Sequence, residues 1–436
     1  MRLSRPYIAM LFMFALFGCA TYSESPLPHQ ADLAATVPAQ GVAALDMDAV
    51  ASVAVLNNPD LKAARAKAQV GQAQAFAAGL LPNPQFSAGL DQPTNQGLGL
   101  ATAYSLGLSY NLQALITQPS KTAAANAARD QAKLDLLWQE WQTVAQARTL
   151  YVQSILNMDK QKFFAAAAEK YVAQAARSGR AFQAGDLGID EAGGDLAILF
   201  DVRTRLGDAE RSALQADRSL HALLGIAPEV QWTLQPLSTP EIPERAAVEE
   251  GLAKLDQTRP DLRALQAGYK SQEELLLKAV LSQFPNISVG FTRSSDTSNV
   301  FTNSFGITLD LPIFDQGQGE IAVQSATRDQ LRAEYQARLD QATGDAWRIW
   351  AEMQQLKAEI QVVQARLPQL QTTVDNAQKA YAAGDMTAAA YLTMLNTLLA
   401  GQTELFDLKQ SLWSDAIALG TVLGTQIEPL AKDSKS

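Results

Sequence analysis

The sequence predicts a mainly α-helical protein with a membrane β-barrel portion, in which one structural unit is written twice. Three observations support this fold class. Short motifs recur about 200 residues apart in the same order, which indicates an internal repeat. Each copy contains a pair of segments in which apolar and small polar residues alternate. Each copy also contains a very long stretch composed of strong helix formers.

Composition excludes several classes of function. The 436 residues include 35 Lys and Arg against 45 Asp and Glu, for a formal net charge of −10. A net acidic chain does not bind nucleic acid by neutralising phosphates, which requires clustered basic residues. Cys19 is the single cysteine, so the chain forms no internal disulfide, and two histidines leave little material for a metal centre. We therefore expect no bound cofactor.

The N-terminal segment is typical of an export signal. Arg2 and Arg5 precede an apolar run over residues 7–17. This run is too short to cross a bilayer as a helix, which takes about 20 residues. A basic start, a short apolar run and small residues at the cleavage point together indicate a secretory signal.

The end of this segment predicts attachment of a lipid. Residues 16–19 read Leu-Phe-Gly-Cys, which resembles the bacterial lipobox, so Cys19 is the expected lipidation site. Ala20 follows in place of the Asp that retains lipoproteins in the inner membrane. We therefore expect a signal peptide at 1–18 and a lipidated, extended tether at 19–44, on the outer membrane of a Gram-negative bacterium.

The repeat is defined by motif pairs in fixed order. Pro59 opens a Pro-Asp-Leu motif that recurs 201 residues later at Pro260, and the Ala-Gly-Asp motif at 184–186 recurs 199 residues later at 383–385. The predicted organisation is a first repeat at 45–234, a linker at 235–245, a second repeat at 246–427 and a C-terminal tail at 428–436.

Each repeat is expected to carry one β-hairpin, at about 84–113 and about 285–314. Residues 104–112 and 304–313 alternate between apolar and small or polar side chains, over about nine or ten residues. This is the span of a tilted membrane strand, although a strand of a soluble sandwich also alternates. Four strands cannot close a barrel, and an open sheet edge is not tolerated in hydrocarbon. The chain must therefore pool its strands with copies of itself.

Long helices are expected at about 118–225 and about 318–424. Residues 120–178 contain no proline or glycine and would form a helix roughly 90 Å long at 1.5 Å per residue. Apolar residues keep a 3–4 spacing from Met353 to Tyr381, which is typical of coiled-coil packing. Pro368 predicts a bend in the second long helix. A soluble coiled coil would explain these helices but not the strands.

Both long helices are expected to turn back at the Ala-Gly-Asp motif. Gly185 and Gly384 suit the left-handed conformation that ends helices, and Asp186 and Asp385 are expected to cap the helices that follow.

These motifs together resemble the TolC family of outer-membrane factors. The resemblance rests on the Asn-Pro-Asp-Leu opening at 58–61, Leu-Pro-Asn-Pro at 81–84 and Leu-Pro-Ile-Phe at 311–314, in addition to the repeat. It implies a homotrimer with a twelve-stranded outer-membrane barrel and a helical tunnel across the periplasm. It also implies a passive exit duct that works with a periplasmic adaptor protein and an inner-membrane transporter of the RND type.

The resemblance places a gate and an adaptor contact at the helix-turn tips. The residues concerned are Phe182, Gly185, Asp186, Asp190, Glu191, Tyr381, Gly384, Asp385 and Met386. Met386 and Ala390 stand where the best-known member has an arginine and an aspartate. We therefore expect a different set of bonds at this tip, with Asp190 or Glu191 as the acidic partner.

The substrate is left open between several classes. Residues 311–321 resemble the heavy-metal branch of the family, and a negative lumen would favour cations. Drug or xenobiotic efflux and type I protein secretion are alternatives. From another class, a periplasmic coiled-coil adaptor lipoprotein would explain the lipid and the helices, but not the strands.

One motif suggests an enzyme but is better explained by chain geometry. Residues 317–322 fit the dinucleotide-binding pattern G-x-G-x-x-A, yet the preceding strand alternates, unlike the buried strands of a parallel sheet. We expect no catalytic activity. Pro312, Gly317 and Gly319 are instead expected to form the turn from the last strand into the second long helix.

Overall fold

The computed structural model describes residues 22–36, 44–94 and 99–425. The chain divides into two compact units, Met1–Leu33 and Ala34–Ser436. The first unit is described only from Tyr22, and there it forms neither helix nor strand. Cys19, the predicted signal peptide and the predicted tail lie outside the described residues.

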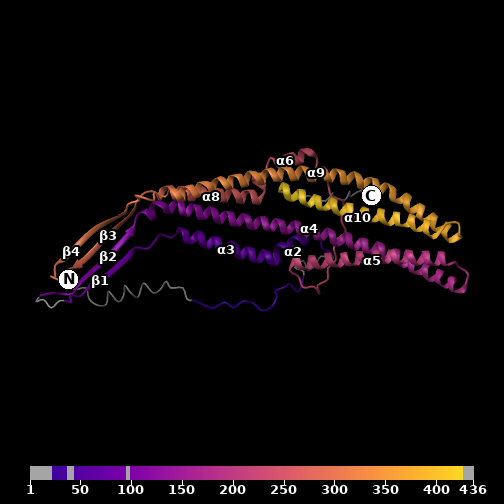
Figure 1. Ribbon diagram of the computed structural model, residues 1–436, viewed down its shortest axis with the longest axis horizontal. Coiled ribbons are helices and arrows are strands. Elements are labelled where there is room, and N and C mark those ends of the chain that lie inside the picture. The colour runs from indigo at the N-terminus through magenta and orange to yellow at the C-terminus, as the bar shows by residue number, and fades with distance from the viewer. Residues whose placement is uncertain (1–21, 37–43, 95–98, 426–436) are drawn as a thin grey trace. The chain divides into compact units, whose positions relative to one another are not determined.

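The second unit repeats one order of elements (Figure 1). The first repeat consists of α2 (Met47–Asn57), α3 (Pro59–Gly79), β1 (Gln85–Asp91), β2 (Ala103–Asn111), α4 (Gln113–Ala184) and α5 (Ile189–Leu224). The second consists of α6 (Arg245–Leu252), α7 (Leu255–Thr258), α8 (Pro260–Leu281), β3 (Asn286–Ser295), β4 (Phe301–Asp310), α9 (Gln318–Ala383) and α10 (Ala388–Leu423).

The described strands form one antiparallel sheet in the order β1-β2-β3-β4, so the hairpins of the two repeats join through β2 and β3. The register places Phe86, Leu108, Phe291 and Phe305 side by side across the sheet. This face is apolar and exposed, with Phe305 at 71% exposure. Serine, glycine and threonine dominate the other face. Among the described residues no second sheet covers the apolar face, as a soluble sandwich would require.

Two strand boundaries differ from the sequence prediction. The alternation was expected to continue to Ile313, but β4 ends at Asp310, where its partner strand begins at Asn286 and Pro312 lacks the N–H needed to continue. β4 also begins three residues before the alternating stretch at 304–313, at Phe301. The Asp296 carboxylate accepts hydrogen bonds from two backbone N–H groups of the turn before β4.

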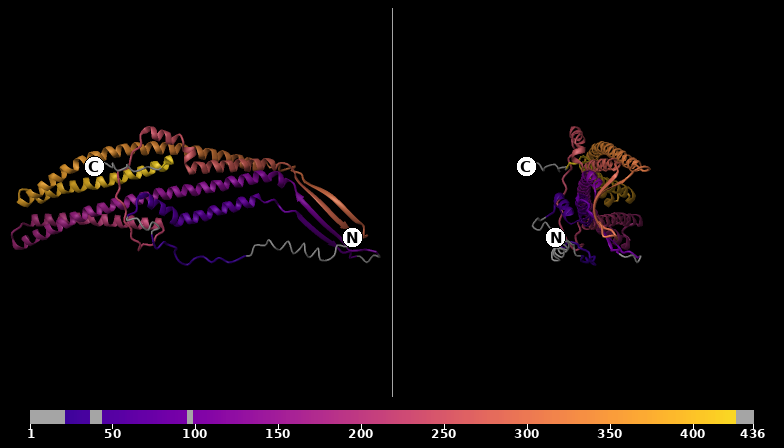
Figure 2. Two further views of the ribbon diagram at one scale, coloured as in Figure 1. Left: turned by 180° about the vertical axis from the view of Figure 1, so that it is seen from behind. Right: turned by 90° about the vertical axis from the view of Figure 1, so that its left-hand side faces the viewer.

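The long helices are continuous. α4 has 72 residues and begins five residues before the predicted start, with Pro119 inside it. α9 has 66 residues and continues through Pro368. The returning helices α5 and α10 pack against α4 and α9, and both pairs extend away from the sheet (Figure 2). No helix within the described ranges has the length and hydropathy needed to cross a membrane.

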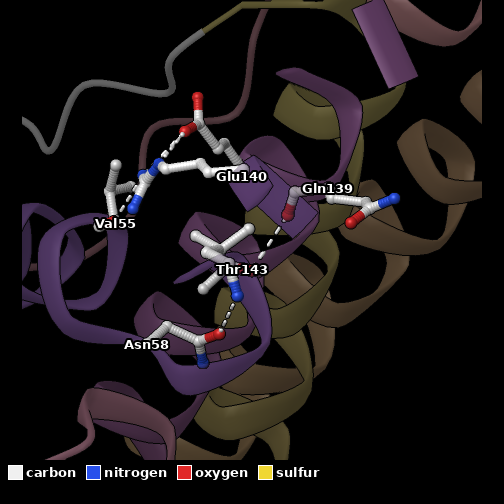
Figure 3. Close-up of polar contacts among 7 residues, drawn as sticks. Val55, Asn58, Gln139, Glu140 and Thr143 are labelled. Carbon is white, nitrogen blue, oxygen red and sulfur yellow. Dashed lines mark hydrogen bonds and ion pairs between the residues drawn. The ribbon is translucent and has the colours of Figure 1, made fainter. Parts of the chain in front are cut away.

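A duplicated joint closes each repeat where its short helices meet the end of its last helix. In the first repeat, Asn58 caps α3 by accepting from the Leu61 N–H at 2.9 Å, and its amide donates to the Leu223 carbonyl at 2.8 Å. Arg65 joins α3 to α4 and α2 through Glu140 and the Val55 carbonyl (Figure 3). Asn58 and Arg65 therefore hold the start of α3 against α2, α4 and the end of α5.

The second repeat builds the same joint with an ion pair. Arg259 replaces the capping asparagine and contacts Asp261 at 2.6 Å, with both side chains buried. The guanidinium also lies over the Trp138 ring of α4, 5.2 Å from its centroid. This cation–π contact joins the second repeat to the first.

We predict that Asn58→Ala lowers the free energy of unfolding by about 1–2 kcal/mol, because the change removes a helix cap and leaves the Leu223 carbonyl without its partner. Chemical denaturation in detergent measures this change. Asn376→Ala, on the exposed surface of α9, is the matched control and should leave stability unchanged. Equal stability of the two variants would contradict the role of Asn58.

Candidate functional site: the helix-turn tips

The two tips are built by the same backbone motif. Gly185 and Gly384 have φ values of +82° and +81°, and each follows the last residue of a long helix. In each tip the glycine and the next aspartate donate backbone hydrogen bonds to carbonyls of the helix end, between 2.9 and 3.1 Å. This is a Schellman arrangement, which requires the left-handed conformation that glycine adopts without strain.

The predicted caps of the returning helices are wrong. Asp186 and Asp385 lie in the turns, whereas α5 is preceded by Gly188 and α10 by Thr387. The Glu191 carboxylate accepts from the Gly188 N–H at 3.0 Å, which satisfies this end of α5. The Thr387 hydroxyl accepts from the Ala390 N–H at 3.3 Å. Each turn is longer than the prediction assumed, so the residue directly after the glycine is too early to act as the cap.

Three tyrosines connect the two tips. The hydroxyls of Tyr171 in α4 and Tyr391 in α10 lie 3.0 Å apart. The Tyr381 ring of α9 stacks on the Tyr391 ring, with centroids 5.3 Å apart and planes 13° from parallel. The Tyr381 hydroxyl donates to the Glu191 carbonyl oxygen at 3.0 Å. Side chains of the second repeat are therefore hydrogen-bonded directly to the first.

A buried carboxylate completes this tyrosine cluster. Asp195 of α5 is buried and accepts from the Gln174 amide at 2.6 Å. Burial raises the pKa of the Tyr381 phenol, and the nearby Asp195 carboxylate raises it further. Burial is also the main cause of the raised pKa of Tyr171 and of Tyr391. All three phenols therefore stay protonated at neutral pH.

Helices α5 and α10 approach each other closely beside this cluster. A Cβ atom added at Gly194 of α5 would lie 2.2 Å from the Ala388 Cβ of α10. Both residues sit next to the apolar core that α4, α5, α9 and α10 share near the tips. Any residue larger than glycine at position 194 would force the two tips apart.

The structure brings together only some of the predicted tip residues. Tyr381 and Glu191 meet, and Met386 packs on the shared core. The side chain of Glu191 caps α5, and the Asp195 carboxylate lies beside the Tyr381 phenol. The expectation that Asp190 or Glu191 is the acidic partner at this tip stays a prediction. The remaining predicted residues line the turns or the exposed surface: Phe182, Gly185, Asp186, Asp190, Gly384 and Asp385.

Sequence reasoning missed Tyr171, Gln174, Gly194 and Asp195. The available signal was periodicity, because Tyr171 and Asp195 occupy positions of α4 and α5 that face a neighbouring helix. An acidic residue at such a position indicates a buried polar contact, since an unpaired buried carboxylate is costly.

The turn from strand to helix uses only one of its two predicted glycines. Gly317 has a φ of +78° and precedes α9, and its N–H donates to the Asp315 carboxylate at 2.8 Å. Gly319 lies inside α9 with ordinary helical φ, so the turn does not require it. Pro312 follows β4. Because β4 is antiparallel to β3, residues 317–322 do not stand in the parallel unit of a dinucleotide site.

Acidic residues do not gather into a metal site in the part of the chain that the structure describes. No group of three or more His, Cys, Asp or Glu side chains is arranged to hold a metal ion there.

We predict that the stability of the tips falls as pH rises above about 10, where unfolded tyrosine ionises. The raised pKa values of Tyr171, Tyr381 and Tyr391 mean that the unfolded state loses these protons first. The stabilisation is therefore complete below pH 10 and declines toward the folded-state pKa. Melting temperatures between pH 8 and 11 test this, and the Tyr171→Phe/Tyr391→Phe variant should decline less steeply. An equal slope in both proteins would contradict it.

Comparisons with known proteins agree with this architecture. Residues 252–425 match the family described as outer membrane efflux protein. The cation efflux system protein CusC of Escherichia coli (strain CFT073) is 24% identical over 245 residues, 52% of this chain and 51% of CusC. The probable outer membrane lipoprotein SilC of Salmonella typhimurium is 27% identical over 176 residues, 38% of each chain. In these alignments the chain thus spans about half the length of CusC and 38% of the length of SilC.

The likeness of fold extends over almost the entire chain. A crystal structure of CusC superposes with a TM-score of 0.75 and 18% identity, covering 94% of this chain and 100% of that one. The outer-membrane channel OprN gives a TM-score of 0.74 at 16% identity, covering 94% and 99%. Residues 252–425 therefore match the family of outer membrane efflux proteins, and the chain as a whole has the fold of TolC-type outer-membrane factors.

Proposed function

We propose that three copies of this chain form the outer-membrane exit duct of a tripartite efflux system. The sheet carries the proposal: its apolar face is exposed, and its outer strands β1 and β4 have no further strand partner among the described residues. Pairing β4 of one copy with β1 of the next gives a closed barrel of twelve strands from three copies. The small polar side chains of the other face would line its lumen.

The helices would continue this duct through the periplasm, and the tips would close it. The tyrosine cluster with Asp195 holds the two tips of each chain together. A periplasmic adaptor would contact the exposed turns at Asp186 and Asp385, and an inner-membrane transporter of the RND type would supply the energy. The duct itself is passive, and Cys19 would anchor it to the outer membrane through a lipid.

We propose heavy-metal cations as the transported class. CusC is named a cation efflux system protein, and residues 311–321 carry the corresponding sequence resemblance. A passive duct requires no metal-binding cluster, because the transporter selects the substrate. Drug efflux and protein secretion are the alternatives.

We predict that weakening the contact between the tips raises the conductance of the channel. Asp195→Asn removes the charge beside Tyr381 and should weaken closure, so that single channels in planar bilayers conduct more current and open more often. Asp190→Asn is the matched control on the exposed surface of the same helix and should behave as the wild type. Equal conductance of all three proteins would place the gate elsewhere, and a monomeric mass in detergent would contradict the duct.

The substrate class is tested by a strain that lacks this protein. We expect greater sensitivity to divalent and monovalent heavy metals, and unchanged sensitivity to dyes, detergents and antibiotics. Re-expression of the wild-type chain is the control and should restore resistance. Sensitivity confined to drugs would exclude metal cations as the principal substrate.

A further inference from the structure

One charged residue stands on the apolar face of the sheet. Side chains alternate between the two faces along a strand, so residues two positions apart share a face. Arg293 is two residues from Phe291 in β3, and β3 pairs with both neighbouring strands without a bulge. Arg293 therefore lies on the apolar face, and it is exposed. The other two charged residues of the described strands, Asp91 and Asp310, lie on the opposite face.

Arg293 lies toward the end of the sheet that is remote from the helices (Figure 1). Ile287, at the helix end of β3, is six residues away, which is roughly 20 Å at about 3.3 Å per residue. In a barrel with strands tilted by about 40°, this separation is roughly 15 Å along the axis. The apolar band of such a barrel is about 25 Å tall, and a charge on it costs little only near its edges. The position of Arg293 is therefore one that a charge can occupy.

The neighbours of Arg293 indicate the level of the lipid headgroups. Tyr104 and Phe301 lie one row nearer the loops, with their ring centroids 6.4 Å apart. Phe291 and Phe305 pair one row nearer the helices. Aromatic side chains gather where the hydrocarbon of a membrane meets water. Arg293 lies between two aromatic rows and therefore at the height at which headgroups join acyl chains.

Asn303 adds a second polar side chain at this level. It stands directly opposite Arg293 in β4, on the same face, and it is also exposed. Neither side chain has an ion-pair or hydrogen-bond partner within the described ranges. The planar guanidinium group can donate two parallel hydrogen bonds to a phosphate, and the asparagine amide can donate another. We call Arg293 and Asn303 the β3/β4 patch.

The repeat shows that the sheet does not require this patch. The counterpart of Arg293 in the first hairpin is Gln92, 201 residues earlier, and that of Asn303 is Tyr104, 199 residues earlier. The first hairpin thus joins the same sheet with no positive charge at this level. Each chain carries one such patch among its described strands, and its basic character belongs to the second repeat alone.

We propose that the β3/β4 patch binds the phosphate of a lipid headgroup in the outer leaflet of the outer membrane. This inference rests on the proposed duct and adds a lipid contact to its outer surface. The patch matches both parts of an amphipathic anion, because Arg293 and Asn303 face the phosphate while Phe291 and Phe305 face the acyl chains. A free phosphate ion would use only the first part. Three copies would carry three such contacts, which fix the depth of the barrel in the membrane.

Lipid binding to the purified channel tests this contact. The protein in a nonionic detergent is titrated with lipid A, and bound lipids are counted on the intact assembly by native mass spectrometry. We expect Arg293→Gln to lower the affinity about tenfold, because charge-assisted hydrogen bonds to the phosphate are lost. Arg293→Lys should restore part of the affinity, since it keeps the charge without the planar fork. Arg263→Gln, which removes an exposed arginine of α8, is the matched control and should bind as the wild type.

Two further probes separate a lipid from a free ion. Phosphatidylcholine carries its own positive charge beside the phosphate, so it should bind equally to the wild type and to Arg293→Gln. Inorganic phosphate alone should give no adduct that depends on Arg293. A phosphate adduct that is present in the wild type and lost in Arg293→Gln would assign the patch to a free ion and overturn the lipid contact.

The mass of the assembly distinguishes failure of this inference from failure of the duct. A trimer that loses affinity for lipid A through Arg293→Gln and not through Arg263→Gln supports the lipid contact. A trimer with equal affinity in all variants, or with an equal loss in both glutamine variants, overturns the lipid contact while leaving the proposed duct intact. A monomer overturns both.

Discussion

The backbone groups along the outer edges of β1 and β4 need hydrogen-bond partners, and the apolar face beside them needs to be removed from water. The described residues of a single chain provide neither. In hydrocarbon each unpaired N–H or C=O group costs several kcal/mol, so a sheet with two open edges is stable in a membrane only after closure. The same closure requires the helices that follow each strand to come together in a ring, which explains why their surfaces are incomplete in one chain.

The two copies of the repeat carry different chemistry at equivalent positions near the tips. Inside the chain, Tyr171 and Tyr391 place two hydroxyls against each other, and Asp195 lies beside them. The counterparts of the two tyrosines in the other copy of the repeat, 199 residues away, are Leu370 and Ala192. The contact within the chain therefore includes directional hydrogen bonds that leucine and alanine at the equivalent positions cannot make. Hydrogen bonds restrict geometry more tightly than apolar packing does, so the tips of one chain are held in a narrower set of positions.

The sequence predictions failed where a short-range rule competed with a longer-range contact. Asp186 and Asp385 suit helix caps, but the turn geometry places Gly188 and Thr387 before the helices. The start of α4 was placed five residues too late; its first turns include Pro119, and the neighbouring Gln118 amide donates to the Ala78 carbonyl of α3. The sequence also did not reveal Asp195, which lies beside the Tyr381 phenol one helical turn beyond Glu191.

The sequence by itself determined the internal repeat, the alternating strands, the long helices and the glycine turns at residues 185 and 384. These features depend on local conformational preference and on the period of apolar residues, both of which are properties of neighbouring positions in the chain. Only the tertiary structure decided which side chains meet across the repeats. The approach of Gly194 to Ala388 and the pairing of Tyr171 with Tyr391 join positions about 200 residues apart. Such contacts depend on the packing of whole helices, which no short stretch of sequence specifies.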